Sequence, residues 1–252
     1  MTQPNITFVS IIVRNPEDPN PITNRIEWLY QLLDAKLPLV LYVCPFFQEL
    51  IKDYKYDGLQ IIPINIDNTL AFKYVHNCFE LPALPKYRTD AKDTHFFCSL
   101  MNVKTEVIEQ AVIDGYVHTP YVSFIDASIV KVLNDRDTTL STLKNTVISD
   151  KLKKPIFPGC LDPNNNKNYT KEYIWNRICW MFCGGFFVLP TSEAFHWNTY
   201  CLNIYSDFLL EGHITWEVNI WAYIVSNGLY SVEWFPADHN DSMLIIPNMW
   251  CI

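Results

Sequence analysis

A short run of strand-forming residues near the middle of the chain ends directly in an acid. Residues 121–125 are aromatic, β-branched or small, and Asp126 follows them at once. Such residues favour a buried strand. In open α/β sheets, ligands bind in the crevice beyond the carboxyl ends of the strands. Asp126 is therefore placed to bind a metal or a ribose, and the alternative is that it only caps the following turn.

The segments before this run alternate between strand and helix patterns. Apolar runs at residues 6–13, 38–44 and 59–66 predict buried strands, and the segments at 23–35 and 46–52 between them predict helices. This alternation is typical of a parallel sheet with crossover helices.

Helix and strand patterns continue in the second half of the chain. Residues 192–211 and 216–223 have helical periodicity, with Thr191 and Thr215 as expected N-caps. A short strand is expected over residues 231–235. Seven of the eight tryptophans also lie in the last third of the chain. Most of them are expected in the core, and one or two at a cleft mouth would offer a flat apolar face to a sugar ring.

The composition suits a protein with a large core rather than a nucleic-acid binder. Hydrophobic residues make up 49% of the 252 positions, and a net charge of −8 argues against a basic nucleic-acid-binding face. The sequence shows no secretory signal and no membrane-spanning run, so a cytoplasmic protein is expected. The eight cysteines form no CxxC pair, and they are expected to be buried free thiols in a reducing compartment.

Two polar residues precede the central strand. A helix is expected over residues 95–110, before Gly115, and it carries Asn102 and Lys104. One interpretation places both side chains on a solvated face. The other has them bind a nucleotide or sugar, with the compact charge of lysine neutralising a diphosphate.

Two glycines open another predicted strand. Gly184 and Gly185 precede an apolar run that ends at Pro190. Glycine at such a position marks either a bulge or turn, or the close approach of a ligand to the backbone.

Two further features in the last part of the chain have both a structural and a functional interpretation. Glu217 lies in the first turn of a predicted helix, where the helix dipole favours a carboxylate. It is also a candidate general base at the edge of a cleft. Residues 237–242 form a polar turn in which His239 stands among acids, a combination that suits a divalent metal such as Mn²⁺.

Taken in order, these motifs resemble the HtrL/YibB (WlaTC-like) family, over most of the chain from the first strand to residue 245. The motifs that carry the resemblance are Met101-Asn102-Val103-Lys104, Phe124-Ile125-Asp126, Cys183-Gly184-Gly185-Phe186-Phe187, Thr215-Trp216-Glu217-Val218-Asn219-Ile220-Trp221 and Ala237-Asp238-His239-Asn240-Asp241-Ser242.

The resemblance implies a glycosyltransferase related to the GT-A nucleotide-diphospho-sugar transferases. It implies an α/β fold, with one domain over residues 1–252 and a mixed, mostly parallel sheet flanked by helices. About residues 1–130 would bind the nucleotide, and about residues 131–252 would form the acceptor side. The reaction would move a sugar from a nucleoside diphosphate sugar to a hydroxyl of a glycan or glycoconjugate.

The resemblance also implies a metal site. Asp126 takes the place of the Asp-x-Asp motif, and His239 that of a late histidine ligand. Both would hold Mn²⁺ or Mg²⁺, with Ser128 as a further ligand. Because the chain has Asp126-Ala127-Ser128, only one carboxylate is present. A weaker or metal-independent site is therefore an alternative.

The remaining roles follow the same resemblance. Glu217 would deprotonate the acceptor if the reaction inverts configuration, which is favoured, or orient the sugar or acceptor if it retains configuration. The residues expected to bind the sugar nucleotide, besides Asp126, are Asn102, Lys104, Gly184 and Gly185, and those expected on the acceptor side are Trp216 and Asp241. Two rival functions stay open: a non-catalytic sugar- or nucleotide-binding protein, and a sugar-nucleotide hydrolase or nucleotidyltransferase.

Overall fold

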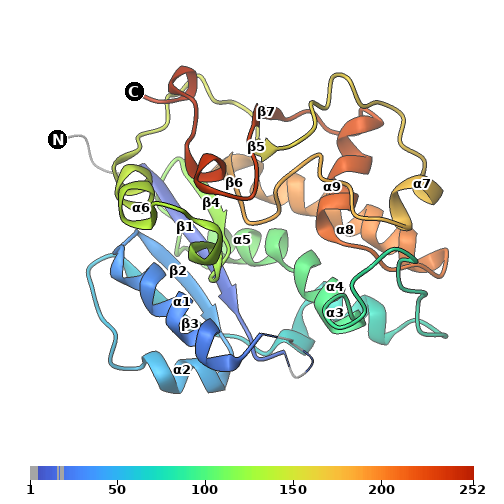
Figure 1. Ribbon diagram of the computed structural model, residues 1–252, viewed down its shortest axis with the longest axis horizontal. Helices are drawn as coiled ribbons and strands as arrows, with labels where there is room; N and C mark the ends of the chain where they lie inside the picture. Colours follow the sequence, from blue (N-terminus) through green and yellow to red (C-terminus); the bar gives the residue numbers. More distant parts are fainter. Residues whose placement is uncertain (1–4, 16, 18–19) are drawn as a thin grey trace.

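One sheet of seven strands runs through the molecule in the computed structural model, which describes residues 5–15, 17 and 20–252 (Figure 1). Its order is β3-β2-β1-β4-β6-β5-β7. The strands are β1 (Ile6–Ile12), β2 (Leu39–Val43), β3 (Leu59–Pro63), β4 (Tyr121–Ile125), β5 (Ile156–Gly159), β6 (Phe186–Pro190) and β7 (Glu233–Pro236).

Most neighbouring strands are parallel. β1 pairs in parallel with both β2 and β4, and β2 pairs in parallel with β3. β6 runs antiparallel to β4 and β5, whereas β7 is parallel to β5. The predicted α/β class, with a mixed and mostly parallel sheet flanked by helices, is therefore confirmed.

The strand order reverses between β1 and β4. From β1 the chain moves outward through β2 to β3, and it then returns to the opposite side of β1 to form β4. The connections after β1 and β4 therefore diverge at the carboxyl ends of these strands, and this divergence opens a crevice. Asp126 directly follows β4 at this edge.

Helices cover both faces of the sheet (Figure 1). Side chains of β1 alternate between two cores: Ile6 and Phe8 pack with α1, α2 and α6, whereas Val9 packs with α5, α8 and α9. The helices are α1 (Ile22–Asp34), α2 (Pro45–Ile51), α3 (Leu70–His76), α4 (His95–Asn102), α5 (Lys104–Ile113), α6 (Arg136–Asn145), α7 (Lys171–Trp175), α8 (Ala194–Leu210) and α9 (Glu217–Ser226).

Aromatic rings fill the core between the sheet and helices α8 and α9. The ring of Phe187 stacks on those of Phe124 and Phe157, with centroids 5.9 and 5.0 Å away. Trp197 and Trp221 pack against the Phe157 ring, and both indoles are buried. Of the seven late tryptophans, Trp197, Trp216 and Trp221 are buried, so the expectation that most of them lie in the core is met only in part.

The helix predicted over residues 95–110 is two helices. α4 ends at Asn102 and α5 begins at Lys104, with Val103 between them. The Asn102 amide donates to the carbonyls of Cys98 and Thr215, at 2.8 and 2.9 Å. These two bonds link the end of α4 to the segment before α9.

The two predicted threonine N-caps are wrong, because neither hydroxyl accepts a backbone N–H of the helix and each has another partner. Thr191 donates to the carbonyl of Thr119 at 2.7 Å, and it belongs to a short 3₁₀ turn before α8. Thr215 accepts a hydrogen bond from the Asn219 amide at 2.8 Å, and Trp216 takes the N-cap position of α9.

Two expectations from composition concern thiols and membranes. All eight cysteines are free thiols: four are buried, three are half-buried, and Cys160 is exposed. Across the described ranges of the chain, no helix combines the length and the apolar character needed to cross a membrane.

Candidate active site

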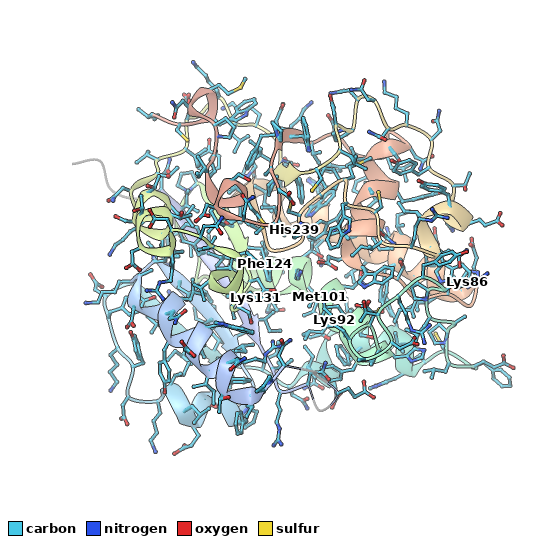
Figure 2. The ribbon with its side chains drawn as sticks, viewed as in Figure 1. Lys86, Lys92, Met101, Phe124, Lys131 and His239 are labelled. Carbon is cyan, nitrogen blue, oxygen red and sulfur yellow. The ribbon has the colours of Figure 1, made fainter. Side chains whose placement is uncertain are left out.

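A pocket lies at the point where the strand order reverses. The loop after β1 contributes Asn15 and Asn20, the segment after β4 contributes Asp126 and Ser128, and Glu217 comes from α9. The pocket holds about 1030 Å³, including its open mouth. Figure 2 shows Lys92, Met101, Lys131 and His239, which all line the pocket, around the centre of the molecule.

The pocket is cationic although the whole chain is acidic. Among the residues that the structure describes, the pocket is lined by two acids, Asp126 and Glu217, and by four cations, while the whole chain carries a net charge of −8. The four cations are Arg25, Lys92, Lys104 and Lys131. A concave site with a local excess of positive charge concentrates anions. The pocket is therefore suited to a ligand that carries phosphate groups.

Asp126 is held at the end of β4 by local hydrogen bonds. Its backbone N–H donates to the carbonyl of Gly185 at 2.9 Å, and its Oδ1 accepts the N–H of Ser128 at 2.7 Å. Burial alone raises the pKa of the Asp126 carboxyl, but Lys104, Lys131, the Ser128 N–H and Arg25 outweigh it and lower the pKa. Asp126 thus caps a turn, as the alternative interpretation had it, and also lines the pocket as a carboxylate.

A buried ion pair joins two candidate residues that are far apart in the sequence. Lys104 Nζ lies 2.5 Å from Glu217 Oε1 and donates to the carbonyl of Gly184 at 2.8 Å. The two side chains are only 4% and 6% exposed. The solvated face considered for Lys104 is therefore wrong. No residue in the described part of the chain donates to the other Glu217 oxygen, Oε2.

The paired glycines allow this close packing. A Cβ at Gly184 would lie 2.4 Å from Glu217 Oε1, and a Cβ at Gly185 would lie 2.8 Å from Ile129 Cδ1. Real Cβ atoms essentially never come this close to other atoms. Any side chain at Gly184 would push Glu217 away from Lys104.

The other candidate residues have structural partners, and two of them lie outside the pocket. Asn102 and Asp241 are not among the lining residues, and the Asn102 amide holds two backbone carbonyls. Trp216 lines the pocket, but it is buried, and its Nε1 donates to Asp93 Oδ1 at 3.1 Å. A direct role in ligand binding is thus not supported by the position of Asn102 or Asp241.

Asp241 fastens the C-terminal segment to the start of α6. Its carboxylate accepts the N–H groups of Asn134 and Asp135, at 2.8 and 3.0 Å, and the Thr139 hydroxyl at 2.8 Å. Burial alone raises the pKa of Asp241, but these donors outweigh it and lower the pKa to about 2.

Asp241→Ala is expected to destabilise the protein by about 2 kcal/mol at pH 7, because three donors lose a charged acceptor. The folded pKa lies below the ordinary value of 3.8, so this stabilisation is complete above that pH and is lost as the pH falls towards 2. Urea unfolding of both proteins at several pH values checks the prediction. Asp137→Ala, at an exposed pair with Arg136, serves as the control. An effect of Asp241→Ala no larger than the control would contradict this assignment.

Sequence reasoning missed the pocket cations Arg25, Lys92 and Lys131, and it also missed Trp180. Arg25 and Lys131 line the pocket, but nothing in their local sequence distinguishes them from surface cations. Trp180 is 41% exposed at the pocket, and its ring meets the His239 ring edge to face at 4.4 Å. The crowding of tryptophans late in the chain was a signal for such a residue, but it did not indicate which one.

The residues expected to bind Mn²⁺ or Mg²⁺ do not form a good site for a hard cation. Asp126 is the one carboxylate of the set, and three cations already lower its pKa. His239 instead lies within 4.8 Å of two thiols, Cys160 and Cys183, whereas Mn²⁺ and Mg²⁺ prefer oxygen ligands. The buried Ser128 Oγ has no hydrogen-bond partner among the described residues, so it is available to a ligand.

Comparison with known proteins gives structural similarities only. No family model matches the chain, and no curated protein matches it. The structure of Rv0371c from Mycobacterium tuberculosis H37Rv has a TM-score of 0.47 and 11% identity, covering 94% of this chain and 90% of its own. Galactosyltransferase LgtC, in complex with donor and acceptor sugar analogs, has a TM-score of 0.47 and 11% identity, with coverages of 90% and 72%. Mouse xyloside xylosyltransferase 1, in its apo form, has a TM-score of 0.47 and 10% identity, with coverages of 92% and 85%.

Proposed function

We propose that this protein is a glycosyltransferase of the HtrL/YibB (WlaTC-like) type, with a GT-A-like fold. It transfers a sugar from a nucleoside diphosphate sugar to a hydroxyl of a glycan or glycoconjugate. One observation carries the proposal: the described residues that line the pocket at the reversal of strand order include four cations and two acids. Cations suit the diphosphate, and carboxylates accept hydrogen bonds from ribose or sugar hydroxyls.

The donor lies along the carboxyl ends of β1 and β4 in this proposal. Asp126 accepts a hydrogen bond from a ribose hydroxyl, and Arg25 and Lys131 contact the diphosphate. Both cations lower the pKa of Asp126 and line the same pocket, so phosphates near them are also near the acid. Residues 1–130 would thus supply most of the nucleotide-binding groups.

The acceptor enters from the side of residues 131–252. Glu217 Oε1 is held by Lys104, which leaves Oε2 for the acceptor hydroxyl. The acceptor oxygen attacks the anomeric carbon, and its proton passes to Glu217. The bond from that carbon to the diphosphate oxygen breaks, and the nucleoside diphosphate leaves with the electron pair. Configuration is inverted in this step. The exposed part of the Trp180 side chain offers an apolar surface to a sugar ring.

The leaving diphosphate is neutralised by side chains in this proposal. Among the described residues, the pocket is lined by four cations and two acids. Cationic side chains can offset part of the negative charge of a diphosphate ester. The family's Mn²⁺ or Mg²⁺ would be held by Asp126, Ser128 and His239, but this set does not fit such an ion, and no step depends on it.

The proposal is tested with a panel of UDP- and GDP-sugars, with and without Mn²⁺. We expect slow release of nucleotide with one donor, faster release when a suitable glycan acceptor is added, and activity without added Mn²⁺. Binding without turnover would favour the non-catalytic rival. Release that no acceptor accelerates, with free sugar as the product, would favour a hydrolase.

Asp126→Asn is expected to weaken binding of the donor nucleotide by roughly 10- to 100-fold, because a ribose hydroxyl loses a charged acceptor. Inorganic pyrophosphate should bind as well as before, or better, because the cations around Asp126 remain. Calorimetry with both ligands measures the difference.

Asp207→Asn, an exposed acid on α8, serves as the control and should change neither affinity. Equal weakening of nucleotide and pyrophosphate binding would show that Asp126 acts on the phosphates or on the fold, and not on the ribose.

A further inference from the structure

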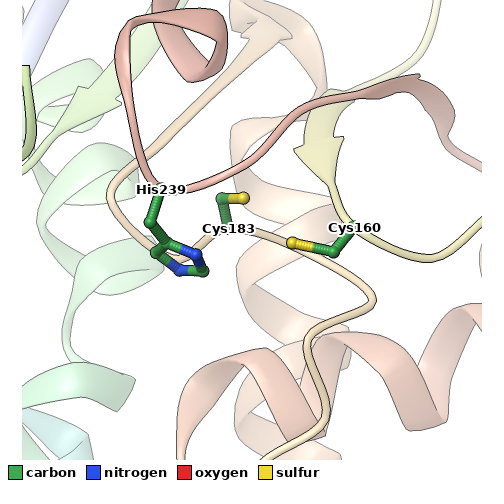
Figure 3. Close-up of side chains that lie close together, drawn as sticks. All are labelled: Cys160, Cys183 and His239. Carbon is green, nitrogen blue, oxygen red and sulfur yellow. The ribbon is translucent and has the colours of Figure 1, made fainter. Parts of the chain in front are cut away.

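Two thiols and an imidazole from three separate loops meet beside the pocket. The ligand atoms of Cys160, Cys183 and His239 all lie within 4.8 Å of one another (Figure 3). Cys160 is exposed, Cys183 is buried, and His239 is half-buried. In the sequence the two cysteines have no metal-binding spacing, because 22 residues separate them. The cluster is therefore a product of the tertiary structure.

The pairing of β5 with β6 and β7 brings the three loops to one edge of the sheet. β5 is parallel to β7 and antiparallel to β6, so the ends of β5 and β7 lie beside the start of β6. Backbone hydrogen bonds then fix the main chain of both cysteines. Cys160 N–H donates to the carbonyl of Trp180 at 3.2 Å, and Cys183 N–H donates to that of Pro158 at 2.8 Å.

The loop that carries His239 is held by the same strand. Ala237 N–H, two residues before the histidine, donates to the carbonyl of Gly159 at 2.9 Å. Gly159 also permits the approach of the cysteine loops, because a Cβ there would lie 1.8 Å from the carbonyl oxygen of Met181. Backbone hydrogen bonds thus hold together the three loops that carry the ligand residues, which favours a preformed site.

We propose that Cys160, Cys183 and His239 bind one Zn²⁺ ion, with Asp238 or water as the fourth ligand. Asp238 Oδ1 lies 3.5 Å from His239 Nδ1 and 3.9 Å from Cys160 Sγ. Two thiolates and one imidazole suit zinc, whereas Mn²⁺ and Mg²⁺ prefer oxygen. On binding, each thiol loses its proton to solvent and forms a sulfur–zinc bond.

The ion would stiffen one wall of the pocket. His239 lines the pocket, and its ring contacts the Trp180 ring. Zinc would therefore join the three loops and hold both rings in place. The inference does not depend on the proposed sugar transfer, because it concerns binding of the metal alone.

The test uses the full chain, reduced, freed of metal and then titrated with Co²⁺ and Zn²⁺. We expect one equivalent of Co²⁺ to give sulfur-to-cobalt charge-transfer bands and the d–d bands of a tetrahedral ion, and Zn²⁺ to displace it. Excess Zn²⁺, at about a hundred times its Kd, should raise the Tm by about 5–10 °C. Mn²⁺ at the same concentration should do neither.

Substitutions assign the ligands. Cys160→Ser changes an exposed side chain and should weaken Zn²⁺ binding more than about 100-fold. Loss of a residue that only contacts a metal ligand usually weakens metal binding by less than this. His239→Ala should have a similar effect, whereas Cys78→Ser, at a half-buried thiol on another loop, should have none. Absence of the charge-transfer bands, or an equal loss of Zn²⁺ binding in the Cys78→Ser control, would overturn the proposal.

Discussion

Glu217→Gln is expected to lower kcat/KM for sugar transfer by roughly 100- to 10,000-fold, the usual contribution of a general base. The glutamine amide has the same shape but accepts no proton from the acceptor. Nucleotide affinity should change by less than about threefold, because Glu217 is placed at the acceptor and not at the phosphates. Steady-state rates with the best donor and acceptor, together with calorimetry of the nucleotide, measure the two effects.

The matched control is Glu211→Gln, which alters an exposed ion pair with Lys171 at 2.6 Å. It should leave both the rate and the affinity unchanged. Full activity of Glu217→Gln would remove this residue from the mechanism. An equal loss of nucleotide affinity would instead assign Glu217 to donor binding.

Lys104→Met is expected to destabilise the protein by about 3–5 kcal/mol, because it leaves the Glu217 carboxylate buried without its partner. For a chain of this size the Tm should fall by about 10 °C. The large effect follows from burial, since both side chains are at most 6% exposed. Urea and thermal unfolding measure it.

A double-mutant cycle separates the charge effect from simple loss of packing. Lys104→Met combined with Glu217→Leu removes both charges, and it should recover most of the lost stability. A deficit of about 1 kcal/mol should remain from the hydrogen bond between Lys104 and the Gly184 carbonyl. Lys171→Met, at the exposed pair, should cost less than about 1 kcal/mol. If Lys104→Met costs no more than Lys171→Met, the buried pair contributes nothing to stability.

The parts of the fold that follow from local patterns were predictable. The alternation of apolar runs with helical periodicity placed β1, β2, β3, α1 and α2 close to their observed positions. Asp126 was placed at the end of a strand because the residues before it are all suited to a strand. Boundaries set by tertiary contacts were not predictable. Val103 divides a helix that looks continuous, and Thr191 donates to the distant carbonyl of Thr119 instead of capping a helix.

In the candidate site, too, single residues were predictable from the sequence, whereas the contacts between them were not. Glu217 and the paired glycines were singled out as separate features, but their contact was not visible in the sequence. Asn102 and Asp241 belong to the same motifs as pocket residues, yet their side chains hold other parts of the chain together. A motif indicates the neighbourhood of a residue, whereas the direction of its side chain depends on what packs against it.

The sequence alone determined the α/β class, the acid at the end of the central strand and the acid at the start of the late helix. These features depend on the properties of neighbouring residues, which periodicity and propensity describe. Only the tertiary structure decided that Lys104 meets Glu217 across 113 residues, and that Cys160, Cys183 and His239 meet at one edge. Such contacts depend on the order in which the strands pair, and no local pattern specifies that order.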